Sequence, residues 1–313
     1  MDNFNLHNKS IFVAGHNGMV GSAVCRQLKK FELEILTAEK SELDLTDKSA
    51  VSAWMSKKRP KVVILAAARV GGIAANNSYP VDFLLENLKI QNNVIETSFQ
   101  VGVEKLLFLG SSCIYPKFSK QPIKEDYLLT GELEKTNEWY ALAKIAGLKL
   151  CQAFRKQYGC DFISAMPTNL YGPNDNFNPE FSHVPAALLR RFHEAKLKKS
   201  ESVEVWGTGK PRREFMHVDD LASAIIFILQ NYSEMQTINI GTGADISIKN
   251  FAKIVKEITG FNGKIIYDAQ KPDGTMIKRL DVSKINHLGW RANIELADGL
   301  IRTYNWALSN EIF

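Results

Sequence analysis

The sequence predicts an α/β fold with a doubly wound parallel sheet and a smaller α/β substrate lobe in the C-terminal half. Four strand-then-helix units occupy roughly the first 110 residues, which favours parallel strands joined by right-handed crossovers. A glycine-rich loop follows the first strand and opens the first helix. After residue 170 the regular alternation loosens, which indicates a second, interleaved lobe.

The first strand is expected at residues 10–14 and leads into Gly15-His-Asn-Gly18-Met-Val-Gly21. Gly15 would permit the tight turn, and Gly18 would let backbone N–H groups approach a pyrophosphate at the helix N-terminus. Gly21 would let the helix pack close to the sheet. The spacing G-x-x-G-x-x-G in this context predicts a dinucleotide-binding Rossmann unit.

The second strand is expected at 34–37, and its end should lie near an adenosine ribose. Glu39 could accept a hydrogen bond from a free 2′-hydroxyl group, which favours NAD, whereas Lys40 could bind a 2′-phosphate, which favours NADP. Either could also be a solvent-facing charge. Asp44 could contact the adenine amino group, and Thr46 or Asp47 could cap a helix.

The third and fourth strands, at 61–65 and 105–110, flank a helix at 81–101. Ala66, Ala67 and Ala68 leave room for a ligand at the end of the third strand. Ser111 and Cys113 follow the fourth strand, and from an extended backbone they would point the same way. Because carboxyl ends of parallel strands face the binding crevice, these segments are candidates for the site.

Tyr140 and Lys144 lie four residues apart on a helix expected at 137–157, so they share one face. An adjacent ammonium group should stabilise the phenolate and lower the pKa of the tyrosine from about 10. Such a tyrosine can give a proton to a ketone oxygen near neutral pH. The same spacing also occurs in ordinary surface pairs.

The second half is expected to hold further elements, with Asp219 capping the helix that ends at 230 and a strand returning to the main sheet at 237–240. The other expected strands are 162–166, 203–206 and 264–267, and the other helices are 184–196, 247–258 and 296–309. These elements suggest a dinucleotide-binding domain of residues 1–170 plus 214–243. A smaller substrate-binding lobe would comprise 171–213 and 244–313.

Composition restricts the class of protein. The 313 residues are 45% hydrophobic and 23% charged, as in globular proteins, and the net charge of +5 is spread without a basic cluster for nucleic acid. The four cysteines show no metal-binding or disulfide spacing. No signal peptide is evident, and the longest apolar run, 221–229, is too short to span a bilayer, so we expect a cytoplasmic protein.

Five stretches together resemble the extended short-chain dehydrogenase/reductase family, and within it the enzymes that act on GDP-linked 4-keto sugars. They are G-H-N-G-M-V-G at 15–21, V-G-G-I-A-A-N-N at 70–77, G-S-S-C-I-Y-P at 110–116, P-T-N-L-Y-G-P-N-D-N-F at 167–177 and W-G-T-G-K-P-R-R-E-F-M-H-V-D-D at 206–220. The resemblance covers nearly the whole chain. It implies NADPH-dependent 3,5-epimerisation and 4-reduction of GDP-4-keto-6-deoxy-D-mannose to GDP-L-fucose.

The resemblance also implies roles for individual residues. Ser111, Tyr140 and Lys144 match the reductive triad, in which tyrosine protonates the C4 ketone oxygen and lysine holds the nicotinamide ribose. Cys113 matches the base that removes protons next to the ketone, and His183 matches the acid that returns them. A buried packing residue and a structural histidine are the ordinary alternatives for these two.

The cofactor-binding residues that the resemblance implies are Gly15, Asn17, Gly18, Met19, Val20, Gly21, Lys40, Asp44, Leu45, Ala66, Ala67, Ala68, Leu109, Gly110, Ser111, Ser112, Tyr140, Lys144, Pro167, Asn169, Leu170 and His183. The substrate-binding residues are Asn169, Arg191, Trp206, Arg213 and Asp273, and no metal is implied. Some relatives carry arginine at Asn17 to hold the 2′-phosphate. Lys40 would act more nearly alone here, so we expect a weaker preference for NADPH over NADH.

Three functions stay open at this point. The first is the bifunctional epimerase-reductase, and the second is a C4-reductase of a related sugar, such as a GDP-4-keto-heptose, with epimerisation absent or done elsewhere. The third is a nucleotide-sensing module without activity, against which the complete Ser111, Tyr140 and Lys144 set argues. By analogy with the family, the chain would form a homodimer through the helices at 81–101 and 137–157.

Overall fold

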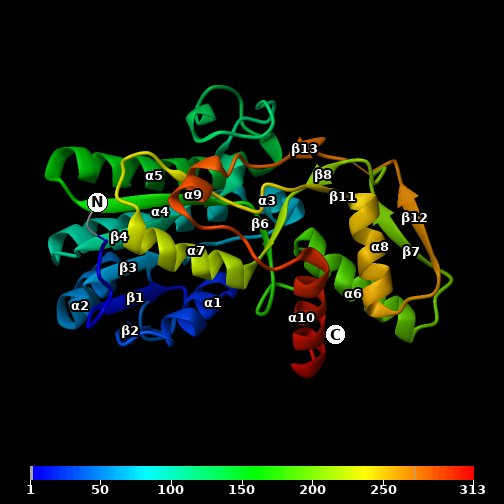
Figure 1. The fold of residues 1–313 in the computed structure, drawn as a ribbon, viewed down its shortest axis with the longest axis horizontal. Helices are drawn as coiled ribbons and strands as arrows, with labels where there is room; N and C mark the ends of the chain where they lie inside the picture. The colour runs from blue at the N-terminus through cyan, green and yellow to red at the C-terminus, as the bar shows by residue number, and fades with distance from the viewer. Residues whose placement is uncertain (1–2, 272) are drawn as a thin grey trace.

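The computed structural model describes residues 3–271 and 273–313, and a six-stranded parallel sheet is its centre (Figure 1). The strand order is β10-β5-β4-β3-β1-β2. The bounds are β1 Ser10–Ala14, β2 Glu34–Leu36, β3 Val62–Leu65, β4 Lys105–Leu109, β5 Asp161–Pro167 and β10 Ile238–Ile240. The chain reverses its direction of travel across the sheet between β1 and β3, which is the switch point where such sheets bind ligands.

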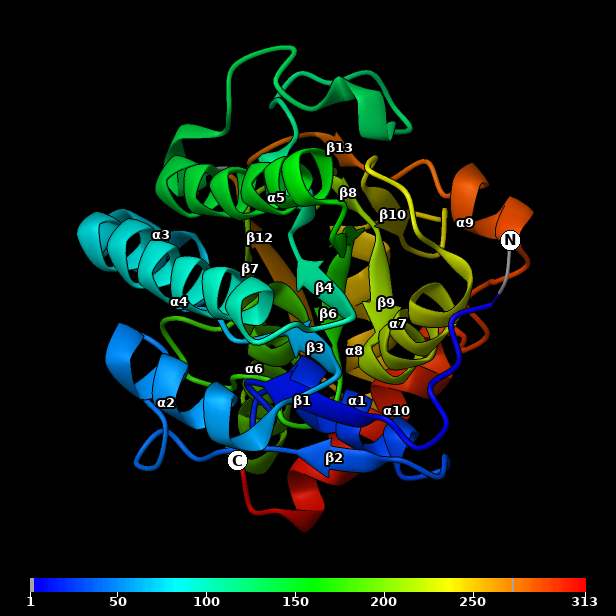
Figure 2. The ribbon, with the colours of Figure 1, turned by 90° about the vertical axis from the view of Figure 1, so that its left-hand side faces the viewer.

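Helices cover both faces of the sheet, which is why its central strands β3 and β4 are buried along their whole length (Figure 2). Helices α2 (Lys48–Lys58), α4 (Pro80–Gln100) and α5 (Glu138–Tyr158) pack against one another on one face. Helices α1 (Met19–Leu28) and α7 (Val218–Asn231) pack together on the other. The predicted doubly wound α/β class is therefore confirmed.

Three small sheets extend the fold beyond the carboxyl ends of the main strands. Strand β6 (Asn169–Tyr171) pairs with β9 (Phe215–His217), and β7 (Ser202–Trp206) pairs with β12 (Lys264–Asp268). Strand β8 (Arg212–Arg213) lies between β11 (Ile246–Ser247) and β13 (Ile277–Lys278). Strands β6, β8, β9, β11 and β13 have only two or three residues each, too few for a periodic sequence signal.

The remaining helices lie mostly around these small sheets. Helices α6 (Val184–Leu197), α8 (Ile248–Thr259) and α10 (Leu296–Ser309) stand at the right of Figure 1. The short elements are α3 (Ile73–Ser78), α9 (Ser283–Leu288), η1 (Ser112–Ile114), η2 (Glu125–Tyr127) and η3 (Lys135–Asn137). Within the described part of the chain, no helix combines the length and apolar character needed to cross a membrane.

Two apolar clusters form the interior. The larger is built on the six-stranded sheet, and the smaller is built from α6, α8, α10 and β7. Trp290 and Ile285, from the C-terminal stretch, pack into the larger cluster, whereas Phe215 packs into the smaller one. The chain thus crosses between the clusters several times, and the predicted domain boundaries stay a prediction.

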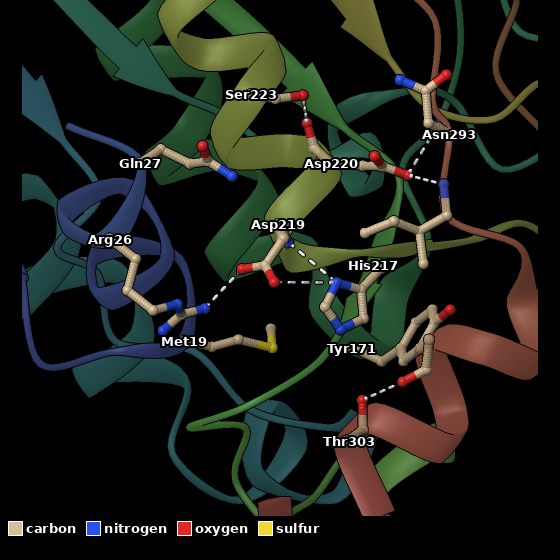
Figure 3. A network of polar contacts seen from close by, with 12 residues as sticks. Met19, Arg26, Gln27, Tyr171, His217, Asp219, Asp220, Ser223, Asn293 and Thr303 are labelled. Carbon is tan, nitrogen blue, oxygen red and sulfur yellow. Dashed lines mark hydrogen bonds and ion pairs between the residues drawn. The ribbon is translucent and has the colours of Figure 1, made fainter. Parts of the chain in front are cut away.

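Helix caps settle two expectations. Asp47 caps α2, accepting hydrogen bonds from the N–H groups of Ser49 (2.8 Å) and Ala50 (3.1 Å). The expectation that Asp219 caps α7 is wrong, because the helix begins at Val218 and His217 is the cap. Asp219 lies inside the first turn, where its carboxylate pairs with Arg26 of α1 at 2.6 Å (Figure 3).

Candidate functional site

The glycine loop lies against the end of β3, at the switch point of the sheet. Gly15 has a φ of +89°, and a Cβ there would stand 2.7 Å from the Ala67 backbone. A Cβ on Gly21 would collide with the Gly15 carbonyl oxygen. The loop therefore needs glycine at both positions, and the N-terminus of α1 is left with free N–H groups that suit a pyrophosphate.

Glu39 is held by the glycine loop at the end of β2. Its carboxylate accepts from Asn17 Nδ2 at 2.7 Å and contacts His16 Nε2 at 3.2 Å. These hydrogen bonds lower the pKa of Glu39, so it carries a negative charge at neutral pH. Lys40 is exposed beside it. The place predicted for the adenosine ribose thus holds both candidate groups. Glu39 is the anion that would favour NAD, and Lys40 is the cation that would favour NADP.

Other predicted cofactor residues line the same edge of the sheet. Asp44 accepts hydrogen bonds from the N–H (2.9 Å) and hydroxyl (2.8 Å) of Thr46, which lower the pKa of its carboxyl group. The Leu45 carbonyl accepts from Asn93, and Ala66 continues the β1–β3 pairing through Ala14. Asn169 donates to the Glu214 carbonyl oxygen at 2.8 Å.

Ser111 and Cys113 are brought together, but not by an extended backbone. The chain turns into helix η1 directly after β4, so that prediction of the local conformation is wrong. Ser111 is the N-cap, and its Oγ accepts from the Cys113 N–H at 3.4 Å. Capping by a serine favours this turn over continued strand, and it leaves Cys113 buried with 8% exposure.

Lys144 is buried below the Tyr140 ring. Its Nζ donates to the Leu109 carbonyl oxygen at 2.9 Å and lies 5.8 Å from the centroid of the Tyr140 ring. Burial lowers the pKa of Lys144 to about 8, and the neighbouring Cys113 acts in the opposite direction. The two residues share one face of α5, as predicted.

The expected low pKa of Tyr140 is not observed. Burial raises the pKa of the phenol, and the Cys113 thiolate would raise it further. The prediction failed because it counted the ammonium charge and left out desolvation, which disfavours the phenolate. Phe83 contributes to this desolvation with its ring centroid 6.4 Å from that of Tyr140. The phenol therefore stays protonated at neutral pH, which is the state of a proton donor.

Burial also raises the pKa of the Cys113 thiol. The largest opposing cause is the ammonium of Lys278 on β13, followed by the hydrogen bond with Ser111 and the charge of Lys144. A thiol so placed stays protonated at neutral pH, and it can act as a base only where neighbouring cations hold it as thiolate. In the described residues, no group of three or more metal-ligating side chains is found.

His183 occupies the N-cap position of α6 and makes no capping hydrogen bond. Its side chain is exposed, and partial desolvation by the surrounding protein lowers the pKa of its imidazole. The preceding loop is fixed at both ends. Asn174 donates to Ser22 of α1 at 2.9 Å, and the Phe181 carbonyl accepts from Gly72 at 3.0 Å.

The predicted substrate-binding residues lie on the small sheets, on α6 and, for Asp273, in the loop between β12 and β13. The Arg191 guanidinium carbon is 5.1 Å from the centroid of the Trp206 ring, and Lys271 approaches the same ring at 5.4 Å. A hollow of about 430 Å³ lies beside this pair between α6 and β7. Arg213 contacts the Asp273 backbone at 3.4 Å, while the Asp273 carboxylate accepts from the N–H and hydroxyl of Thr208.

This geometry joins a dinucleotide crevice to a half-buried serine and tyrosine and a buried lysine. Residues 11–241 match the model of the NAD dependent epimerase/dehydratase family. The chain belongs to this family. It is 58% identical to GDP-L-fucose synthase 1 of Arabidopsis thaliana over 96% of this chain and 93% of the relative.

Solved structures of family members superpose closely. A GDP-L-fucose synthetase from Naegleria fowleri bound to NADP is 28% identical with a TM-score of 0.92, over 99% of this chain and 98% of that one. MlghC, a GDP-mannoheptose C4 reductase from Campylobacter jejuni with NADP bound, is 42% identical with a TM-score of 0.88, over 96% and 98%.

The sequence analysis missed residues that reach the site from short strands. Lys278, beside Cys113, comes from the two-residue strand β13, and its position depends on pairing with β8. Glu214 was noted only as one letter of the motif around Arg213. The signal available for it was an acid directly before the apolar pair Phe215-Met216.

Proposed function

We propose that the chain catalyses NADPH-dependent 3,5-epimerisation and 4-reduction of GDP-4-keto-6-deoxy-D-mannose to GDP-L-fucose. The observation that carries the proposal is the gathering of Ser111, Cys113, Tyr140 and Lys144 beyond the carboxyl end of β4. The 58% identity with a GDP-L-fucose synthase supports this choice of substrate.

Epimerisation is assigned to Cys113 and His183. The ketone at C4 acidifies the hydrogens at C3 and C5, and the Cys113 thiolate removes them. Hydrogen bonds from Tyr140 and Ser111 stabilise the enolate oxygen that results. His183 returns a proton on the opposite face, and its lowered pKa makes the imidazolium a stronger acid, although a less abundant one.

Reduction is assigned to Tyr140, Lys144 and Ser111. The raised pKa of Tyr140 keeps the phenol protonated, so it can neutralise the alkoxide that forms at C4. Ser111 holds the ketone oxygen, and Lys144 places a positive charge below the phenol. Arg191 and Arg213 are assigned to the diphosphate, with Trp206 packing beside them.

The residues fit a dinucleotide. The glycine loop has no room for a Cβ at Gly21 and frees the N–H groups of α1 for a pyrophosphate, while Lys144 can reach a ribose hydroxyl beside Tyr140. Bound NADPH would supply the hydride for C4. The anion Glu39 next to Lys40 supports a preference for NADPH that is weaker than an arginine at position 17 would give.

Exchange in D2O tests the proposal. The protein is incubated with GDP-4-keto-6-deoxy-D-mannose without cofactor, and deuterium at C3 and C5 is read by mass spectrometry and NMR. We expect incorporation at both carbons, and NADPH oxidation once the cofactor is added. Competent reduction with no exchange would contradict epimerisation, and no oxidation with any GDP-4-keto sugar would contradict an enzymatic role.

A second candidate is reduction at C4 of a related GDP-4-keto sugar such as a heptose. It is favoured by the 42% identity with the Campylobacter jejuni GDP-mannoheptose C4 reductase, which is lower than the identity with the fucose synthase. Retained Cys113 and His183 do not exclude it. Comparing kcat/KM for a panel of GDP-4-keto hexoses and heptoses separates the two functions.

The same proposal includes a cytoplasmic homodimer. Large apolar side chains are exposed along α4 and α5, which pack side by side on one face of the sheet (Figure 2). They are Val81, Leu85, Trp139, Leu142 and Tyr158. Pairing this face with its copy would remove these side chains from water.

A further inference from the structure

Strands β8 and β13 carry two cations of the candidate site but are too short to hold themselves in place. Each has two residues, with Arg213 opposite Lys278 in the parallel pairing. Such a pair makes few ladder hydrogen bonds, and isolated short strands are not stable in water. Something else must fix the positions of Arg213 and Lys278.

Glu214, which directly follows β8, is fully buried and makes the missing contacts. One carboxylate oxygen accepts from the N–H groups of Thr242 (2.6 Å) and Gly243 (2.8 Å), in the loop after β10. The other accepts from the N–H of Leu280 at 2.8 Å, just beyond β13. A carboxylate can accept on both sides at once. Burial raises the pKa of Glu214, and the hydrogen bonds from Leu280, Gly243 and Thr242 act in the opposite direction.

The backbone of Glu214 completes the junction. Its N–H donates to the Lys278 carbonyl at 3.2 Å, and its carbonyl accepts from the Asn169 side chain at 2.8 Å. Gly241 leaves space for the carboxylate, because a Cβ there would collide with Glu214 Oε1. Three other segments of the chain, at 169, 241–243 and 278–280, therefore meet at this one residue.

We propose that Glu214 is a positioning residue that anchors β8 and β13 to the main sheet, and so fixes Arg213 for the diphosphate of the substrate and Lys278 beside Cys113. The inference rests on the proposed function for the identity of the ligand. It makes the buried acid a determinant of substrate affinity without contact with the substrate.

Glu214→Gln tests the inference because glutamine has the same shape but only one accepting oxygen. Its NH2 group must face the N–H groups of 242 and 243 or that of Leu280, so one anchor is lost. Asp220→Asn is the matched control. Asp220, on α7, is also buried and accepts from the N–H groups of Asn293 (3.1 Å) and Ile294 (2.9 Å) (Figure 3).

Binding of GDP and of NADPH is measured by calorimetry, and amide hydrogen exchange is followed in the peptide 276–282 without ligand. We expect Glu214→Gln to weaken GDP binding by about tenfold or more, the effect of losing a charged hydrogen bond, with NADPH binding changed less than about twofold. Exchange in 276–282 should become faster. Asp220→Asn should lower the melting temperature similarly and leave GDP binding and that peptide unchanged.

Three results would overturn the inference: unchanged GDP affinity in Glu214→Gln, an equal loss of GDP and NADPH binding, or unchanged exchange in 276–282. A wild-type protein that does not bind GDP would instead contradict the proposed function. In that case the exchange measurement still decides whether Glu214 holds β13.

Discussion

At the scale of single residues, burial acts on Tyr140 and Lys144 in opposite directions. It raises the pKa of the phenol and lowers that of the ammonium group to about 8, so it favours the neutral form of each. The phenol is then ready to donate a proton at neutral pH. The ammonium is charged below about pH 8 and loses its charge above it.

The lowered pKa of Lys144 predicts how the rate of reduction depends on pH. As pH rises through about 8, Lys144 loses the proton that its role requires, so kcat/KM for NADPH should fall. Lys144→Arg should remove this decline, even with a lower maximum, because guanidinium stays charged to above about pH 12. A flat wild-type profile up to about pH 9.5, or the same decline in the arginine variant, would contradict the assignment.

The Cys113 thiol depends on the charge of Lys278. Because burial raises its pKa and Lys278 is the largest opposing cause, Lys278→Gln should raise the pKa further and slow alkylation of Cys113 by iodoacetamide by about tenfold near pH 8. Lys278→Arg should retain most of the rate. Peptide mass spectrometry distinguishes Cys113 from Cys25 and Cys160. Equal rates in the glutamine variant and the wild type would rule out this electrostatic role.

At the scale of elements, the glycine loop offers a test of cofactor contact. Gly18 has a φ of −73°, and the nearest atom to an added Cβ is 3.5 Å away, so Gly18→Ala should fold normally. The methyl group would nevertheless occupy the space where the N–H groups meet a pyrophosphate. We expect NADPH affinity to fall about tenfold with an unchanged melting temperature. Unchanged affinity would mean that the dinucleotide does not approach this loop.

Long elements were predictable from sequence, and short ones were not. Helix α5 and strand β4 have continuous periodic patterns, and the glycine loop has a motif, so their positions were found within a residue or two. Strand β13 and helix η1 have two or three residues, and tertiary contacts define them. The same contrast between local and long-range signals holds for the candidate site. Helical spacing predicts that Tyr140 and Lys144 share one face of a helix, whereas the positions of Lys278 and Glu214 depend on pairing between distant segments.

At the scale of the whole molecule, segments of the second half of the chain contribute alternately to the two apolar clusters. The C-terminal stretch that contains Ile285 and Trp290 packs on the main sheet, while Phe215 packs among α6 and α8. We propose that the lobes unfold as one cooperative unit because the chain crosses between them repeatedly. A single calorimetric transition is the expected result, and two separable transitions would contradict it.

The exposed face of α4 and α5 predicts a dimer in solution. The pair Leu85→Glu and Leu142→Glu should yield a monomer by light scattering after size exclusion, because charges would be buried at the interface. Leu197→Glu, on the similarly exposed end of α6, is the control and should leave the mass unchanged. A wild-type monomer, or a double variant that remains a dimer, would exclude this surface as the interface.

The most direct test of the account is proton donation by Tyr140. Tyr140→Phe removes the hydroxyl and keeps the ring packed against Phe83, so NADPH and GDP should bind with wild-type affinity in calorimetry. In a single turnover with GDP-4-keto-6-deoxy-D-mannose, we expect NADPH oxidation to slow by at least about a thousandfold, as for loss of a general acid. Oxidation within about threefold of the wild-type rate would contradict the central claim.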